Sequence, residues 1–390
     1  MTTNKNHNSP NVPNLRFPEF EGEWEKIKLK DVCTFYSGGT PSSSNKDYYT
    51  GDIPFIRSGE LHESCTELFI SKDGLNNSSA KIVHKGDLLL ALYGATSGDI
   101  AISQIEGAIN QAILCINTEQ SKEYIKAVWQ KHVQKILQTY LQGGQGNLSA
   151  DIVKNISFYF ALSKEQDKLA NFIRLLDERI ATQNKIIEKL QSLIKGLVDS
   201  LLENPSWEKV YLCSFMQFYS TNSLSWEQLS YSNGNVRNMH YGLIHGFQMS
   251  LIDSTLLPRI LPNYLPKQYT VCQDGDVVFA DASEDTNEIG KAIEFSNTIN
   301  VKTVCGLHTI HGRDIKQNTI LGFKGFAFNS RYFHDQVRRL AQGTKVYSIT
   351  AKNLLSCFVY IPDVIKQENI VRLLNAYEEN LSLNRTLLNK

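Results

Sequence analysis

Hydrophobic positions follow two patterns along this chain. Between Ser163 and Glu203 apolar residues recur every three or four positions, which is the spacing of a coiled-coil helix. A shorter stretch from Ile370 onward has the same spacing. Elsewhere, short apolar runs such as 87–93 and 276–280 lack polar alternation and follow Gly-containing turns, which favours short buried strands. The pattern predicts a mixed α/β (α+β) chain that carries two long helices.

The two helices are expected to pair with each other. Their predicted coiled-coil core consists of Leu169, Phe172, Leu176, Ile180, Ile187, Leu190, Ile194, Leu197, Ile370, Leu373, Tyr377 and Leu381. Asn184 interrupts this seam, and Pro205 ends the first helix. Homodimerisation is the usual role of such a seam. Because a globular segment separates the two copies, antiparallel pairing within one chain costs less chain entropy.

An internal repeat organises the sequence. Residues 24–27 (WEKI) recur as 207–210 (WEKV), and 85–89 (KGDLL) recur as 274–278 (DGDVV). The order of these and later matches is kept while the loop lengths differ. The chain therefore contains a tandem duplication of a unit of about 183 residues. Each unit is one domain followed by one helix, and the pair is expected to have a pseudo-two-fold axis.

The repeat predicts five segments. These are an N-terminal tail at 1–23, a first globular domain at 24–162, a central helix at 163–204, a second globular domain at 205–362, and a C-terminal helix at 363–390.

Composition narrows the class of protein. Of the 390 residues, 42% are hydrophobic and 21% charged, with 40 basic and 40 acidic side chains, which is typical of a globular protein without a global polyanion-binding surface. No apolar run reaches the length of a membrane span, and the polar N-terminal stretch does not resemble a secretory signal. The seven cysteines are odd in number and widely spaced, which favours buried thiols in a reducing cytoplasm.

Catalytic motifs are missing from the sequence. It contains neither a GxxxxGK[ST] phosphate loop nor a GxGxxG turn, and residues 204–207 (NPSW) favour a linker over a methyltransferase motif. His308 and His311 have no third ligand nearby in the sequence, so no metal site is predicted. Acidic residues at 284, 285 and 288 lack a lysine at nuclease spacing. We expect no catalytic residues and no cofactor.

The ordered set of motifs resembles the specificity subunits of type I restriction–modification systems, from about residue 15 to the end. Five motifs carry the resemblance in the first unit: 38–42 (GGTPS), 51–56 (GDIPFI), 92–98 (LYGATSG), 110–113 (NQAI) and 143–149 (GGQGNLS). Three carry it in the second: 275–285 (GDVVFADASED), 306–310 (GLHTI) and 341–349 (AQGTKVYSI).

The resemblance implies a fold, a function and partners. Each globular domain would be a target recognition domain that reads one half of a bipartite, asymmetric sequence in double-stranded DNA. The coiled coil would set the spacer between the halves and hold two modification subunits, which bind S-adenosylmethionine and methylate adenine N6. Two restriction subunits can join them, and the specificity subunit itself would be non-catalytic.

DNA-contacting residues are expected in loops and at strand ends, among side chains able to reach base edges or phosphates. The candidates are Lys46, Tyr48, Arg57, Thr96, Ser97, Gln145, Asn147, Asn222, Arg237, Asn238, His240, Lys291, Arg331, Thr344 and Lys345. Neither domain is basic overall: residues 24–163 carry 13 basic and 14 acidic side chains, and residues 207–362 carry 14 and 12. Any DNA-binding face must therefore arise from charge segregation, with the modification subunits supplying part of the phosphate contact.

Two other classes remain open from the residues alone. One is a stand-alone DNA methyltransferase or nuclease, against which the missing cofactor and metal motifs argue. The other is a non-enzymatic scaffold that recognises protein, which the zero net charge leaves open.

Overall fold

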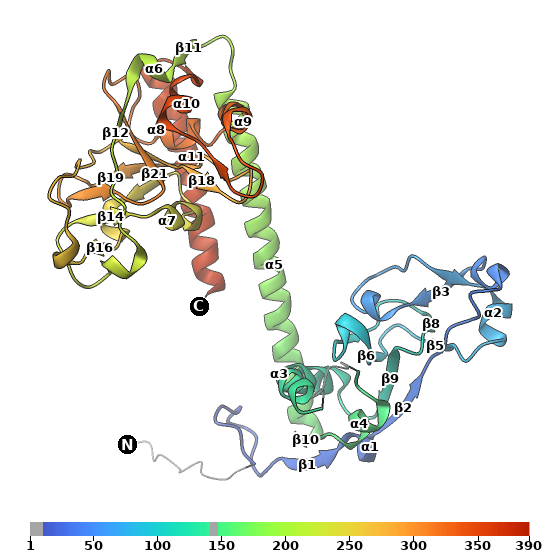
Figure 1. Ribbon diagram of the computed structural model, residues 1–390. Helices are drawn as coiled ribbons and strands as arrows, with labels where there is room; N and C mark the ends of the chain where they lie inside the picture. The colour runs from blue at the N-terminus through green and yellow to red at the C-terminus, as the bar shows by residue number, and fades with distance from the viewer. Residues whose placement is uncertain (1–10, 141–146, 390) are drawn as a thin grey trace, which may run out of the picture. The chain divides into compact units, whose positions relative to one another are not determined.

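The computed structural model describes residues 11–140 and 147–389. The chain forms two compact units, Met1–Arg179 and Ile180–Lys390, which we call unit 1 and unit 2. Their boundary falls inside the 40-residue helix α5 (Ser163–Leu202). Figure 1 shows the elements of both units, which we describe separately.

Unit 1 is built on two four-stranded sheets, with strand orders β2-β9-β6-β7 and β4-β3-β8-β5. A two-stranded ribbon pairs β1 with β10. The strands are β1 (Glu25–Lys28), β2 (Cys33–Ser37), β3 (Ile53–Ile56), β4 (Phe69–Ile70), β5 (Lys81–Val83), β6 (Leu88–Ala91), β7 (Ile100–Ile102), β8 (Gly107–Ile109), β9 (Ile113–Thr118) and β10 (Ser157–Phe160). The helices before α5 are α1 (Leu29–Val32), α2 (Lys72–Asn76), α3 (Lys122–Tyr140) and α4 (Ala150–Asn155), with 3-10 helices η1 (Lys46–Tyr49), η2 (Ser58–Glu60) and η3 (Gly94–Thr96).

Helix α3 covers the sheet that contains β6. Its Trp129 is fully buried in a core cluster with Leu88 and Leu90 of β6, and its indole Nε1 donates to the carbonyl of Gly98 at 2.8 Å. A buried indole needs such a partner for its N–H. The bond also anchors the loop between β6 and β7, which carries two of the predicted DNA contacts.

Unit 2 contains a five-stranded sheet, β12-β21-β17-β19-β15, and a four-stranded sheet, β13-β16-β14-β20. Its strands are β11 (Glu208–Tyr211), β12 (Met216–Tyr219), β13 (Leu229–Ser230), β14 (Arg237–Met239), β15 (Leu251–Asp253), β16 (Arg259–Ile260), β17 (Val277–Ala280), β18 (Ala282–Ser283), β19 (Ala292–Ser296), β20 (Thr303–Cys305), β21 (Thr309–Asp314), β22 (Tyr347–Ser348) and β23 (Phe358–Ile361). Its helices after α5 are α6 (Leu212–Phe215), α7 (Tyr241–Gly246), α8 (Phe323–Ala327), α9 (Arg331–Leu340), α10 (Ala351–Leu355) and α11 (Val364–Leu388), with η4 (Trp226–Gln228), η5 (Ser254–Leu256) and η6 (Pro262–Tyr264).

The two units repeat one framework. The order β2-β9-β6-β7 in unit 1 corresponds to β12-β21-β17-β19 in unit 2, and β1 with β10 corresponds to β11 with β23. Helices α1 and α6 begin with equivalent hydrogen bonds. The Leu29 amide donates to the Ile156 carbonyl, and the Leu212 amide donates to the Cys357 carbonyl, both at 2.9 Å. This confirms the predicted mixed α/β fold with an internal repeat.

A buried glutamine begins the long helix of each unit. Gln166 in α5 donates from Nε2 to the carbonyl of Ala161, and Gln367 in α11 donates from Nε2 to the carbonyl of Pro362. Both bonds span five residues, and both side chains are nearly inaccessible to solvent. Both bonds hold the segment after the last strand against the first helical turn, so Gln166 and Gln367 have the same structural role in the two units.

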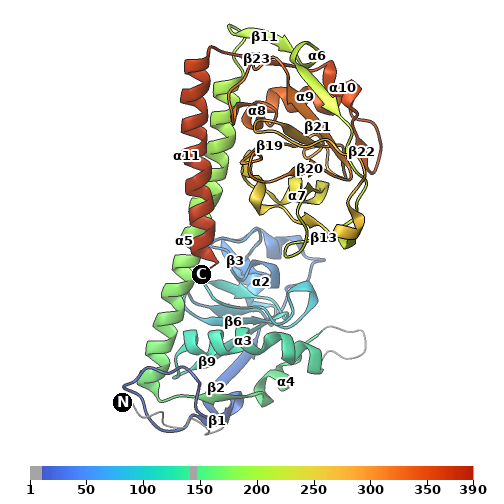
Figure 2. The same cartoon turned by 90° about the vertical axis from the view of Figure 1, so that its left-hand side faces the viewer.

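Within unit 2 the end of α5 and helix α11 lie side by side and antiparallel, as Figures 1 and 2 both show. Val198 and Leu202 of α5 share a core cluster with Ile370 and Leu374 of α11. Nearer the other end of α11, Gln183 donates from Nε2 to the Asn384 side-chain oxygen at 2.6 Å. The predicted antiparallel pairing within one chain is therefore correct, and Gln183 rather than Asn184 makes the polar contact with Asn384.

The seam differs from the predicted one on α11. Ile370 and Leu381 are buried as expected, but Leu373 is 41% exposed and Tyr377 half-buried, while Leu374 is fully buried. The reason is that α11 packs on the globular part of unit 2 as well as on α5, so its buried stripe turns toward that domain.

On α5 the predicted core residues fall into two sets. Ile187 is buried, and Leu190, Ile194 and Leu197 are half-buried. The earlier positions do not form a buried seam: Leu169 packs on the core of unit 1, and Phe172, Leu176 and Ile180 are 49%, 41% and 48% exposed. Helix α11 has 25 residues against 40 in α5, so it is too short to cover the whole of α5.

Glu378 of α11 gives unit 2 a pH-dependent stability. Its buried carboxylate accepts hydrogen bonds from the Ser250 amide and hydroxyl, each at 2.9 Å, yet burial raises its pKa from 4.5 to about 7. The folded chain thus binds this proton more tightly than the unfolded chain, so stability is lost as pH rises through about 7. We expect Glu378→Gln to remove this loss, leaving the variant more stable than wild type near pH 8, by up to roughly 3 kcal/mol, and similar near pH 5.

Urea denaturation at the two pH values measures this difference. A variant that is no more stable than wild type at the higher pH would contradict the assignment.

Among the described residues, no helix combines the length and apolarity needed to cross a bilayer.

Candidate nucleic-acid interface

The predicted contacts of unit 1 fall into two groups. The first group is a pair of loops: the β6–β7 loop carries Thr96 and Ser97, and the segment before α4 carries Asn147. The Leu148 amide donates to the Leu92 carbonyl at 2.8 Å, so the backbone joins the two loops. Asn147 is exposed and Thr96 half-exposed, whereas the Ser97 hydroxyl donates to the Leu92 carbonyl and closes its own loop. Gln145 lies outside the described residues.

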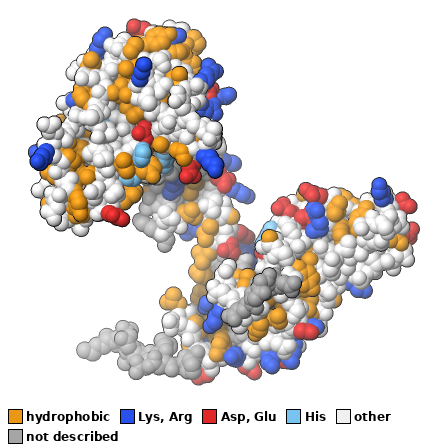
Figure 3. Space-filling view, in the orientation of Figure 1, with side chains coloured by type: hydrophobic (Ala, Val, Ile, Leu, Met, Phe, Trp, Pro, Cys, Tyr) orange, Lys and Arg blue, Asp and Glu red, His pale blue; other side chains and the backbone are white. Residues whose placement is uncertain are grey.

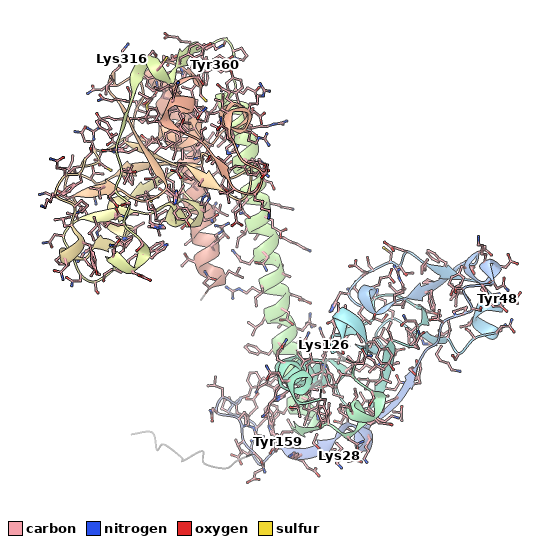
Figure 4. The ribbon with its side chains drawn as sticks, viewed as in Figure 1. Lys28, Tyr48, Lys126, Tyr159, Lys316 and Tyr360 are labelled. Atoms are coloured by element: carbon pink, nitrogen blue, oxygen red, sulfur yellow. The ribbon has the colours of Figure 1, made fainter. Side chains whose placement is uncertain are left out.

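The second group, Lys46 and Tyr48, lies in η1 beside the sheet that contains β3. Lys46 is exposed and Tyr48 half-buried, and the turn begins with the Asn45 side chain, which accepts from the Asp47 amide. Figure 4 places Tyr48 at one tip of unit 1, away from Lys28 and Tyr159 of the β1–β10 ribbon. The candidates of unit 1 in these two groups therefore lie in different segments, one in η1 and one in the joined β6–β7 and pre-α4 loops.

The Arg57 side chain forms hydrogen bonds with two glutamates of its own unit. Its guanidinium donates from Nε and Nη2 to Glu60 at 3.1 and 3.0 Å, and from Nη2 to Glu67 at 2.6 Å. Burial acts to raise the pKa of Glu60, but hydrogen bonds from Arg57 and from the Glu67 amide outweigh it and lower the pKa to about 2. The two carboxylates thus accept from Nε and Nη2, so Arg57 supports its loop in this conformation while 41% of its side chain remains exposed.

Four predicted contacts of unit 2 make hydrogen bonds within their own fold, and of these Asn238 and His240 are buried while Asn222 and Arg237 are half-buried. Asn238 of β14 is fully buried and accepts from Asn222, which also donates to the Cys305 carbonyl at 3.0 Å. His240 is 3% exposed, caps α7 through its Nδ1 and lies against the Trp226 ring, and Arg237 donates to the Leu257 carbonyl. Each of these side chains has a hydrogen-bond partner within the fold, although Nδ2 of Asn238 is buried without one, and sequence position alone could not reveal this.

The remaining contacts of unit 2 lie on two surfaces. Arg331 is exposed at the start of α9, where it lines a pocket of about 690 Å³ together with Lys195, Lys291 and Arg338. Lys291 is held there by Glu288 at 3.4 Å. Thr344 and Lys345 are fully exposed in the loop before β22, which pairs with β18.

Charges of both signs are interspersed on these units. On the face visible in Figure 3 neither unit shows a continuous surface of Lys and Arg. Within α9, Arg338 pairs with Asp335, and Arg331 lies 3.9 Å from the same carboxylate. Ion pairs of this kind neutralise some of the basic side chains. Among the described residues, exposed basic side chains outside such pairs include Lys345 in a loop and Lys352 on α10.

The chain is similar to several type I specificity subunits. Residues 21–192 match the sequence model of the type I restriction modification DNA specificity domain. The specificity subunit of the type I restriction enzyme MjaVIII from Methanocaldococcus jannaschii is 21% identical over 402 residues, covering 98% of this chain and 91% of that protein. The MjaIX specificity subunit of the same organism is 28% identical over 184 residues, covering 43% of this chain and 42% of that protein.

A solved structure shares the fold. The crystal structure of a type I restriction–modification S subunit from M. genitalium superposes with a TM-score of 0.64 at 13% identity, and the match covers 97% of this chain and 95% of that one. The matched family domain contains both sheets of unit 1, and unit 2 repeats their strand order. Residues 21–192 therefore match the type I restriction modification DNA specificity domain, and the chain is similar over nearly its whole length to a type I specificity subunit.

Proposed function

We propose that this chain is the DNA-recognition subunit of a type I restriction–modification complex and does no chemistry itself. Each unit reads one half of a bipartite, asymmetric sequence in duplex DNA, and the paired helices set the unspecified spacer. The observation that carries this proposal is the repeated framework with unlike loops. Both units carry the same sheet order, while the loops attached to it differ in length and in exposed side chains.

The side chains proposed to contact DNA are those that are at least partly exposed and that make no side-chain hydrogen bond among the described residues. They are Lys46, Tyr48, Thr96 and Asn147 in unit 1, and Arg331, Thr344 and Lys345 in unit 2. Hydroxyl, amide and lysine side chains of this kind suit contacts to phosphate oxygens and base edges.

Two modification subunits are the proposed protein partners, and two restriction subunits can join them. Exposed apolar side chains on α5 support a protein-binding role for this helix. Leu175, Ile186 and Leu193 are 50%, 40% and 44% exposed, which is unusual along one helix of a globular protein. A pseudo-symmetric repeat supplies two similar docking surfaces, so two copies of one partner can bind. S-adenosylmethionine and the methylation of adenine N6 belong to those partners.

Co-expression with a modification subunit tests the function. Long-read sequencing of DNA from such cells is expected to show adenine methylation at one bipartite motif with a constant spacer. Methylation at a continuous motif, or no methylation that depends on this chain, would contradict the proposal. A chain that binds S-adenosylmethionine by itself would favour the enzyme alternative instead.

Lys345 is the best-placed phosphate contact in unit 2. It is exposed, and no carboxylate among the described residues lies within ion-pair distance of it. We expect Lys345→Ala to weaken DNA binding by the assembled complex about equally for all sequences, and to reduce the slope of log affinity against log salt by about 1. Fluorescence anisotropy at several salt concentrations measures this slope.

Lys352→Ala is the matched control, because Lys352 is equally exposed on the neighbouring helix α10. If both variants behave alike, Lys345 has no specific role in binding.

A further inference from the structure

Three potential metal ligands meet in the interior of unit 2. Cys272 precedes β17, Cys305 ends β20, and His311 lies in the middle of β21; they are 2%, 3% and 0% exposed. Their ligand atoms all lie within 4.8 Å of one another, and they are the one such group among residues 11–140 and 147–389. Thirty-three residues separate the two cysteines in the sequence, so the fold alone brings them together.

Neighbouring side chains hold the His311 ring in one orientation. Nε2 donates to the Asp276 carboxylate at 2.7 Å, and Arg313 holds that carboxylate through bonds of 2.7 and 2.6 Å. The other ring nitrogen, Nδ1, is buried and has no hydrogen-bond partner. Histidines that bind metals typically donate one N–H to a carboxylate in this manner, which leaves the other nitrogen's lone pair for the ion.

The spacing of the two sulfur atoms fits a shared ion. Their Sγ atoms are 3.6 Å apart, well beyond the length of about 2.05 Å for a disulfide bond. Two thiolates bound at about 2.3 Å to one tetrahedral zinc ion lie roughly 3.8 Å apart. The surrounding cluster is apolar and includes Met239, Ile252 and Phe295.

We propose that Cys272, Cys305 and His311 bind a structural zinc ion, with Asp276 and Arg313 orienting the histidine. Two thiolates and one imidazole form a donor set that suits zinc among divalent ions, and a water molecule is left to complete the tetrahedron. The bound ion gives the orphaned Nδ1 its partner and compensates the charge of two buried thiolates.

The position of the site suggests what the ion stabilises. Cys305 belongs to the sheet β13-β16-β14-β20, whereas His311 belongs to the sheet β12-β21-β17-β19-β15. The ion would therefore link the two sheets of unit 2. The Cys305 carbonyl accepts from Asn222, which holds Asn238, so the same link would stiffen the base of these loops. Metal binding itself does not depend on the proposed function.

Elemental analysis of the full chain, purified under reducing conditions and without a histidine tag, tests the proposal. We expect about one zinc ion per chain in wild type. Cys272→Ser and Cys305→Ser should each lower zinc affinity at least tenfold. Cys357→Ser is the control, since Cys357 is equally buried in another core cluster of unit 2 and should leave the zinc content unchanged.

Cobalt substitution of wild type keeps the test valid if the serine variants fail to fold. Co²⁺ should produce d–d bands of tetrahedral intensity together with thiolate-to-metal charge-transfer bands, and zinc should abolish both. A wild-type chain that binds neither ion, zinc content that is equal in the Cys272 and Cys357 variants, or a Cys272–Cys305 disulfide in the reduced preparation would each overturn the proposal.

Discussion

Inserting four residues into α5 after Glu178 is expected to lengthen the spacer of the methylated motif by one or two base pairs and to leave both half-sites unchanged. Four helical residues add about 6 Å and rotate the remainder of the helix by about 40°. One base pair of B-form DNA advances about 3.4 Å along the axis and turns about 34°. The shift and rotation that the insertion adds to α5 therefore match those of one to two base pairs in direction and size. The insertion precedes Gln183, where the contact with Asn384 begins, and therefore spares the paired part of the coil.

The same four residues inserted into α11 after Leu387 form the control, because α5 is then unchanged and the spacer should keep its length. Long-read methylation sequencing reads the motif in both cases. Altered half-sites with an unchanged spacer would show that α5 does not set the spacer length.

Replacing Lys324 by Met is expected to destabilise unit 2 by about 3–5 kcal/mol, because it leaves the Glu294 carboxylate buried without a counter-ion. The Lys324 ammonium lies 3.1 Å from that carboxylate, and the two side chains are 3% and 0% exposed. Burial already raises the pKa of Glu294. A carboxyl group with a raised pKa in the folded state loses stability as pH rises, so the defect of Lys324→Met should grow toward neutral pH.

The double variant Glu294→Gln with Lys324→Met is the control. It removes both charges and keeps an acceptor for the Gly325 amide, which donates to Glu294 at 2.9 Å, so it should recover most of the lost stability. Urea unfolding near pH 5 and near pH 8 measures all three proteins. A single variant as stable as wild type near pH 8 would show that the pair contributes little.

Much of the fold could be predicted from local patterns. Heptad spacing located the helix that spans Ser163–Leu202, because a seam of this kind is visible in any single sequence. The repeated motifs predicted that the two halves of the chain have the same strand framework, since similar sequences at equivalent turns favour similar local structure. The sequence contains no phosphate-loop or GxGxxG motif, from which we predicted no nucleotide-binding machinery.

The candidate site was less predictable, because exposure and partners are non-local properties. Arg57 and Lys345 both lie in motif loops, yet Arg57 is held by two carboxylates while Lys345 is exposed. Nothing in the spacing of Asn238 indicated that it would be fully buried. The prediction placed Leu373 on the buried face of α11, but the structure buries Leu374 instead. The reason is that this helix packs on a domain as well as on α5.

The sequence by itself determined the duplication, the two helices and the resemblance to type I specificity subunits. Each of these depends on residues that are near one another in the chain or repeated along it. Only the tertiary structure decided which polar side chains remain free, and it alone brought Cys272, Cys305 and His311 together. The physical reason is that hydrogen bonding, ion pairing and metal binding depend on distances in space, and strand pairing sets those distances between residues that are far apart in sequence.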